Sequence, residues 1–203
     1  ERRVKSVAIV EAAAGAKAIK VEYNMPRVHA NLTITYHLNL DGDLLINEKL
    51  DVDENAKDKP QLFRYGMQWV LPAEYQEVEY YGRGPGENYI DRNNGDRIGL
   101  YRQSVESQYW NYIRPQESGN KTDVRYWRVL NAANKGLEFI ATGKMECSAL
   151  NFLPEDLDSG TDKGATQFHS GDLTPRNFTV VQVQQRQSGT GCVNSWGAWP
   201  REE

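Results

Sequence analysis

Cysteine and long apolar runs are scarce in this chain of 203 residues, and its 24 basic residues are outnumbered by 28 acidic ones. Its two cysteines, Cys147 and Cys192, are too few for a disulfide framework, and free thiols are the expected state. The formal net charge of −4 argues against a nucleic-acid partner, because phosphate binding needs a basic surface. No apolar run reaches the roughly 18 residues of a membrane helix. Neither a nucleic acid nor a membrane is therefore expected as a partner.

The chain also lacks a recognisable targeting segment. Charged residues interrupt the apolar stretch within Glu1–Lys20, so no secretory signal is predicted there. Because the first residue is not methionine, we expect the chain to be a piece of a longer polypeptide. Any signal would then precede Glu1, and the sequence itself leaves the cellular compartment open.

Alternation of apolar and polar residues, which is typical of strands, runs through most of the chain. In Leu32–Leu40, large apolar side chains alternate with threonine, histidine and asparagine, as in a strand with one buried face. Asp41-Gly42 then predicts a two-residue hairpin turn, and Leu44–Leu50 is the returning strand. Further strands are predicted at Val4–Val10, Ala18–Tyr23, Phe63–Val70, Glu77–Tyr81, Ile98–Gln103, Asp123–Asn131, Leu137–Thr142, Met145–Phe152 and Asn177–Gln187.

Helical periodicity is absent over any window longer than about two turns. Asn134-Lys135-Gly136 predicts a second hairpin, between two of the strands named above. The pattern predicts an all-β fold, a large antiparallel sandwich, with residues 1–203 forming a single domain.

Three segments resist strand assignment: Gly82–Gly95, Pro115–Asn120 and Pro154–Gly171. The first overlaps Tyr80–Arg92, a stretch too rich in glycine and in charge to predict a core. We expect Arg83 and Arg92 to pair with Glu87 and Asp91, and these residues with Tyr89 to form a rigid structural turn. A carboxylate bound to arginine has a lowered pKa and is a poor acid catalyst, so a structural role is favoured.

Two residues in the other loops are candidates for chemistry. Glu117 lies in the second loop, where a structural role is again favoured. His169 lies in the third loop, where a structural role and a site role are equally supported. The histidines show no metal-ligand spacing, and no P-loop, dinucleotide motif or Ser-His-Asp order is present.

The tryptophans divide into two groups. For Trp110 and Trp127, a position in the hydrophobic core is favoured. Trp196 lies in a tail rich in glycine and serine, residues 189–200, where few neighbours are available to bury it. It either packs on the surface of the domain or stacks on a sugar ring.

Four motifs together resemble a known family. In chain order they are Tyr81-Gly82-Arg83-Gly84-Pro85 with Glu87-Asn88-Tyr89 and Asp91-Arg92; Tyr112 with Pro115-Gln116-Glu117-Ser118-Gly119-Asn120; Asp123-Val124-Arg125 with Trp127; and Asn194-Ser195-Trp196. Their order and spacing are similar to those of the C-terminal domain of β-galactosidases of glycoside hydrolase family 2. The resemblance covers nearly the whole chain, most closely Leu62–Trp199.

The resemblance implies a supersandwich like that of galactose mutarotase, packed on a catalytic (β/α)₈ barrel of the same polypeptide. The barrel supplies both catalytic glutamates for retaining hydrolysis of terminal β-galactosides, so no catalytic residue is expected in this chain. Trp196, after Asn194 and Ser195, matches a tryptophan that forms an apolar platform for the sugar, and His169 is a further candidate for substrate binding. Magnesium and sodium are expected in the barrel, and no cofactor is expected in this chain.

The chain departs from the family pattern at its end. The family usually continues after the tryptophan loop into a closing strand, and here we expect that strand to be missing, which leaves a sheet edge unpaired. Relatives with a different barrel pocket cleave other sugars, so the sugar that the parent cleaves is left open.

Two other functions are alternatives to an accessory domain of a β-galactosidase. One is a free-standing epimerase of the mutarotase type, with His169 and Glu117 as its acid and base, and the other is a carbohydrate-binding or interdomain module.

Overall fold

The computed structural model describes residues 2–12, 16–60, 62–158 and 169–188. The chain divides into two compact units, Glu1–Gln61 and Leu62–Glu203. In the described residues each unit contains one antiparallel sheet, which confirms the predicted all-β, antiparallel class. A single domain over the whole chain stays a prediction.

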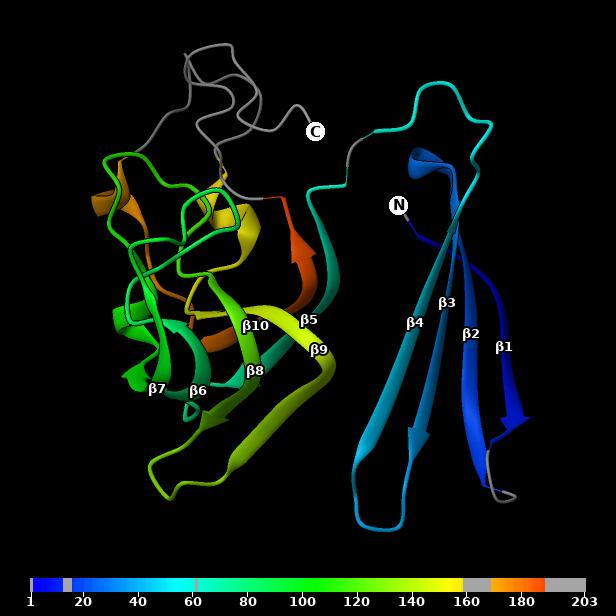
Figure 1. Ribbon diagram of the computed structural model, residues 1–203, viewed down its shortest axis with the longest axis horizontal. Helices are drawn as coiled ribbons and strands as arrows, with labels where there is room; N and C mark the ends of the chain where they lie inside the picture. Colours follow the sequence, from blue (N-terminus) through cyan, green and yellow to red (C-terminus); the bar gives the residue numbers. More distant parts are fainter. Residues whose placement is uncertain (1, 13–15, 61, 159–168, 189–203) are drawn as a thin grey trace. The chain divides into compact units, whose positions relative to one another are not determined.

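The first unit is a four-stranded sheet with the order β1-β2-β3-β4 (Figure 1). Its strands are β1 (Arg3–Glu11), β2 (Lys17–Met25), β3 (Ala30–Leu38) and β4 (Leu44–Val52), with a short 3-10 turn, η2 (Pro26–Val28), between β2 and β3. The alternation predicted for Leu32–Leu40 is confirmed at its start, where Leu32 and Ile34 are buried while Thr33 between them is partly exposed. It is wrong at its end, because Leu38 and Leu40 are exposed and β3 stops at Leu38.

The hairpin between β3 and β4 is longer than predicted. Leu38 pairs with Leu44, so residues 39–43 form the connection. The Asn39 Oδ1 atom accepts hydrogen bonds from the backbone N–H groups of Asp41 and Asp43, at 3.0 and 2.7 Å, and Gly42 has φ of 91°. The predicted two-residue turn is in the right place but has the wrong length, because the Asn39 side chain organises a wider loop.

The second unit is a six-stranded sheet with the order β5-β10-β9-β8-β6-β7 (Figure 1). Its strands are β5 (Arg64–Pro72), β6 (Glu77–Gly84), β7 (Arg97–Ser104), β8 (Lys121–Leu130), β9 (Gly136–Leu150) and β10 (Phe178–Gln187). The described part of this unit also contains three 3-10 turns: η3 (Glu106–Gln108), η4 (Pro154–Leu157) and η5 (Ser170–Asp172). In the described residues, no helix has the length and apolarity needed to cross a membrane.

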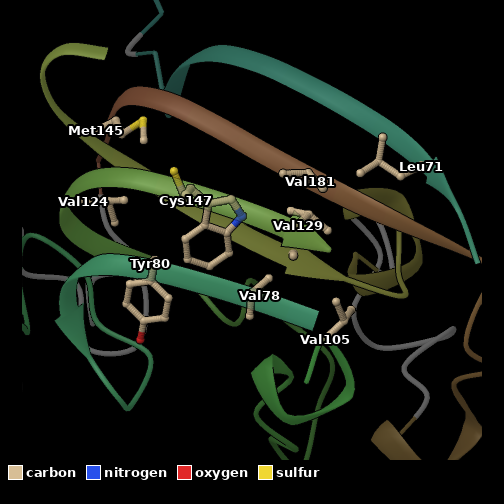
Figure 2. Close-up of a cluster of buried hydrophobic side chains, with 11 residues drawn as sticks. Leu71, Val78, Tyr80, Val105, Val124, Val129, Met145, Cys147 and Val181 are labelled. Carbon is tan, nitrogen blue, oxygen red and sulfur yellow. The ribbon is translucent and has the colours of Figure 1, made fainter. Parts of the chain in front are cut away.

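The hydrophobic core of the second unit lies on one face of its sheet. Figure 2 shows the side chains that gather there, which include Val78 and Tyr80 of β6 and Val181 of β10. Trp127 is fully buried among them, with its ring centroid 4.9 Å from that of Tyr80, which confirms its predicted core position. Cys147 is a free, buried thiol whose pKa is raised by burial, whereas Cys192 lies outside the described residues.

One predicted pair of strands proves to be a single strand. Leu137–Thr142 and Met145–Phe152 were expected to be separate, but β9 runs from Gly136 to Leu150. Its register with β8 shifts, since Tyr126 pairs with Ile140 and Val124 pairs with Met145. Residues 141–144 therefore lie opposite Arg125 alone, and this bulge explains the break in the alternation.

Candidate functional site

The glycine-rich turn begins inside a strand. β6 continues to Gly84, so the expectation that Gly82–Gly95 contains no strand is wrong for its first three residues. A Cβ atom on Gly84 would lie 2.2 Å from the Tyr80 hydroxyl, and one on Gly82 would lie 2.9 Å from Val124. A side chain at either position would overlap a neighbour, Tyr80 of the same strand or Val124 of the adjacent strand β8, which accounts for the two glycines.

Glu87 is the centre of a polar cluster that joins two loops. Its carboxylate side chain is only 7% exposed. It accepts hydrogen bonds from Arg92 Nη2 at 2.5 Å, the Tyr112 hydroxyl, Ser118 Oγ at 3.2 Å and the Gly119 backbone N–H at 2.8 Å. We call these five residues the Glu87 cluster. The predicted pair of Glu87 with Arg92 is confirmed, and the cluster fixes the turn against the loop that ends at Asn120.

The electrostatics of the Glu87 cluster keep Tyr112 protonated. Burial and the hydrogen bond to the Glu87 carboxylate raise the pKa of Tyr112 to about 12. The Arg92 guanidinium lies over the rings of Tyr89 and Tyr112, 4.9 and 5.9 Å from their centroids. The Tyr112 hydroxyl is therefore a hydrogen-bond donor to Glu87 at any ordinary pH.

Arg83 does not pair with its predicted partners. Its Nε and Nη2 atoms donate to Asp123 Oδ2 at 3.1 and 2.8 Å, and its Nη1 atom donates to the Asp96 carbonyl. Asp123 also forms an ion pair with Lys144. Lys144, which has the larger effect, and Arg83 both lower the pKa of Asp123. The expectation failed because β8 lies beside β6 in the sheet, which brings a distant carboxylate closer than the local ones. Asp91 is half-buried, and its pairing with an arginine stays a prediction.

The same turn also contributes to the interior, which its composition did not predict. Asn88 and Tyr89 are fully buried. The Asn88 Oδ1 atom accepts hydrogen bonds from the backbone N–H and the hydroxyl of Thr122, at 2.8 and 2.7 Å, while its Nδ2 atom donates to the carbonyls of Arg83 and Gly86. These bonds satisfy the buried amide, so the turn is a rigid element of the structure.

The two candidate acid–base residues have separate partners. Glu117 forms an ion pair with Arg64 of β5 at 2.5 Å, which agrees with the favoured structural role. His169 is exposed, and its Nδ1 atom lies 3.4 Å from the carbonyl oxygen of Ile113. The carboxylate needed by the epimerase alternative is thus already bound to a cation. No group of three or more potential metal ligands occurs among the described histidines, cysteines and carboxylates.

Trp110 is the residue that sequence reasoning placed wrongly. It was expected in the core, but it is 60% exposed. It follows η3 in a loop, outside any strand alternation, and this position was the available signal of exposure. The predicted sugar-binding residues Asn194, Ser195 and Trp196 lie outside the described residues, so their roles stay predictions.

Comparison with known proteins agrees with the four motifs. The family model described as "Beta galactosidase small chain" matches residues 2–203, and the chain therefore belongs to the β-galactosidase small-chain family.

Several bacterial proteins named as β-galactosidases are similar to the chain. Identity is 30% over 202 residues with that of Halalkalibacterium halodurans, 33% over 180 with that of Priestia megaterium and 32% over 181 with that of Lactobacillus delbrueckii subsp. bulgaricus. These alignments cover 92%, 89% and 88% of this chain but only 19%, 16% and 17% of the relatives. The chain thus spans less than a fifth of their length.

Proposed function

We propose that this chain is the accessory small-chain domain of a retaining β-galactosidase. It packs on a catalytic barrel in the same parent polypeptide and contributes Trp196, with Asn194 and Ser195 beside it, to the sugar site. It does not hydrolyse galactosides alone. Family membership supports the first statement, as do relatives whose length is more than five times the matched part.

The observation that carries the proposal of inactivity is the state of the loop carboxylates. Retaining glycosidases need two carboxyl groups about 5–5.5 Å apart, one as nucleophile and one as acid and base. Glu87 and Glu117 each form an ion pair with an arginine, and Glu87 is in addition fully engaged with three other donors. Neither is available for attack or proton transfer, which is consistent with catalytic glutamates elsewhere.

A rate measurement tests this proposal. The purified chain is expected to hydrolyse a chromogenic β-galactoside no faster than the buffer blank, while the parent polypeptide hydrolyses it. A rate above blank that is lost in Glu117→Gln would show that the chain has its own active site.

The role of Trp196 is tested in the parent polypeptide. Loss of one stacking contact of about 1–2 kcal/mol predicts that Trp196→Ala raises KM by roughly 5- to 30-fold. Trp199→Ala, in the same tail, is the matched control and is expected to leave KM unchanged. Equal effects of the two substitutions would remove the platform role from Trp196.

The metals belong to the same proposal. We place magnesium and sodium in the barrel, so chelation of magnesium is expected to lower the activity of the parent and to leave the Tm of the isolated chain unchanged.

The epimerase alternative is tested by polarimetry of fresh α-galactose, whose mutarotation the isolated chain is expected not to accelerate.

A further inference from the structure

The segment Tyr109–Arg114 exposes large apolar side chains on a loop. Trp110 is 60% exposed and Ile113 is 81% exposed, and Arg114 beside them is exposed as well. Covering an exposed tryptophan is favourable, because burial of its large apolar ring surface lowers the free energy. The segment therefore has the composition of a contact surface.

The backbone of this segment is held in place by several parts of the second unit. The Trp110 N–H donates to Ser118 Oγ at 2.7 Å, and the Trp110 carbonyl accepts the Tyr112 N–H at 2.9 Å. The Tyr112 hydroxyl is bound to Glu87, and the Tyr109 ring packs on Phe152 with centroids 4.9 Å apart. The Ile113 carbonyl lies within 3.4 Å of the His169 ring.

A rigid backbone with exposed apolar side chains is the arrangement that favours tight association. Little conformational entropy is lost when such a loop is covered, because its backbone is ordered beforehand. Tryptophan is also among the residues that contribute most to the affinity of protein interfaces.

We propose that Tyr109–Arg114 is a docking surface that packs into an apolar pocket on another part of the parent polypeptide. The inference rests on the proposed function, because it requires such a parent. The occupant is protein because the relatives contain more than four-fifths of their length outside the matched part, which is ample chain to cover the loop. A protein pocket also suits Ile113, whose branched aliphatic side chain offers a sugar hydroxyl no hydrogen bond.

Hydroxyl-radical footprinting tests the docking directly. Trp110 and Ile113 are expected to react readily in the isolated chain and about fivefold more slowly in the parent, since docking turns exposed side chains into buried ones. Trp127, which is fully buried, is the internal control for folding and stays unmodified in both. Equal reactivity of Trp110 in the two proteins overturns the proposal, and so does protection of Trp110 in the isolated chain by added galactose, which would identify a sugar contact.

A double substitution provides a second measurement. Trp110→Ser with Ile113→Ser is expected to leave the Tm of the isolated chain unchanged, because both side chains are exposed there, and to lower the Tm of the parent. Leu100→Ser, at a side chain 71% exposed on β7, is the matched control. An unchanged Tm in the parent contradicts docking. Hydrolysis by the unsubstituted parent and not by the isolated chain would still support the proposed function in that case.

Discussion

At the scale of single residues, Glu87 determines how two loops meet. Its carboxylate is nearly buried and accepts hydrogen bonds from Arg92 in the turn before β7 and from Gly119 in the loop before β8. Hydrogen bonds to a buried charged group are worth more than those between neutral groups, and their loss leaves the partners unsatisfied.

Replacement of Glu87 by glutamine is therefore expected to lower the free energy of unfolding by about 2 kcal/mol. Urea denaturation followed by tryptophan fluorescence measures this loss. Glu79→Gln is the control, because its ion pair with Arg128 is partly exposed and is expected to contribute less than about 1 kcal/mol. Equal losses of unfolding free energy in the two variants would show that burial of the Glu87 carboxylate adds no stability beyond that of a partly exposed ion pair.

Lys121 is a second buried charged residue, but its surroundings disfavour its charge. It is 1% exposed, and its Nζ atom donates to the Gly119 carbonyl at 3.3 Å. Burial lowers its pKa to about 8, although Glu87 and Asp96 act in the opposite direction. The unfolded chain binds this proton more strongly than the folded one, so the ammonium destabilises the fold below pH 8.

Lys121→Met is expected to stabilise the chain by about 3 kcal/mol at pH 7, from the difference between the folded and the ordinary pKa. The destabilisation by Lys121 is complete below its folded pKa and is relieved as the pH rises from about 8 to 10.5. Urea unfolding at pH 7 and pH 9.5 measures it: the gap between the variant and the natural chain should narrow at the higher pH. Lys49→Met, at an exposed side chain, controls for the general effect of the substitution, and a gap independent of pH would refute the titration of Lys121.

At the scale of elements, the bulge between β5 and β10 depends on one glycine. The register shifts between Gln184 and Arg186, and Gly66 lies opposite Gln184 with φ of 154°. A Cβ atom there would lie 2.2 Å from the Val183 carbonyl oxygen and 2.5 Å from the Gln184 Cα, both backbone atoms that cannot move alone.

Gly66→Ala is expected to destabilise the chain by about 3 kcal/mol, because overlap with backbone is added to an unfavourable φ. Thermal unfolding followed by circular dichroism measures the change. Gly143→Ala in β9 is the control, since a Cβ there meets nothing within 4 Å. A neutral Gly66→Ala would show that the bulge relaxes without cost.

The elements themselves were largely predictable, because alternation and turn residues are local signals. Asn134-Lys135-Gly136 marks a hairpin that the structure contains, with Leu130 paired to Gly136. Two of the errors arise where a distant residue decides the outcome. Asp123 binds Arg83 from 40 positions away, and the bulge in β9 is defined only against β8. Trp110 was misplaced because a large apolar side chain favours burial. The hydrogen bonds that fix its backbone in an exposed loop involve Ser118 and Tyr112, and the sequence pattern does not reveal them.

At the scale of the whole molecule, the distribution of tryptophan separates the two units. All five tryptophans follow Leu62, and none lies in Glu1–Gln61. Tryptophan fluorescence therefore reports on the second unit alone, while circular dichroism reports on the strands of both.

The predicted single domain requires the two signals to change together. Urea unfolding followed by fluorescence and by circular dichroism is expected to give one midpoint, as a cooperative transition does. A dichroism change that precedes or follows the fluorescence change would show that the first unit unfolds as a separate domain.

The order of the strands has a consequence for how the chain is made. Among the strands that the structure describes, β5 is at the edge of its sheet, and its neighbour there is β10, which leaves the ribosome more than a hundred residues later. At translation rates of roughly 5–20 residues per second, β5 waits about 5–20 seconds for its partner. During that time its alternating segment, which contains Trp69 and Leu71, is an unpaired apolar strand of the kind that aggregates. Shielding of β5 until β10 has been synthesised is therefore expected to reduce aggregation of the nascent chain.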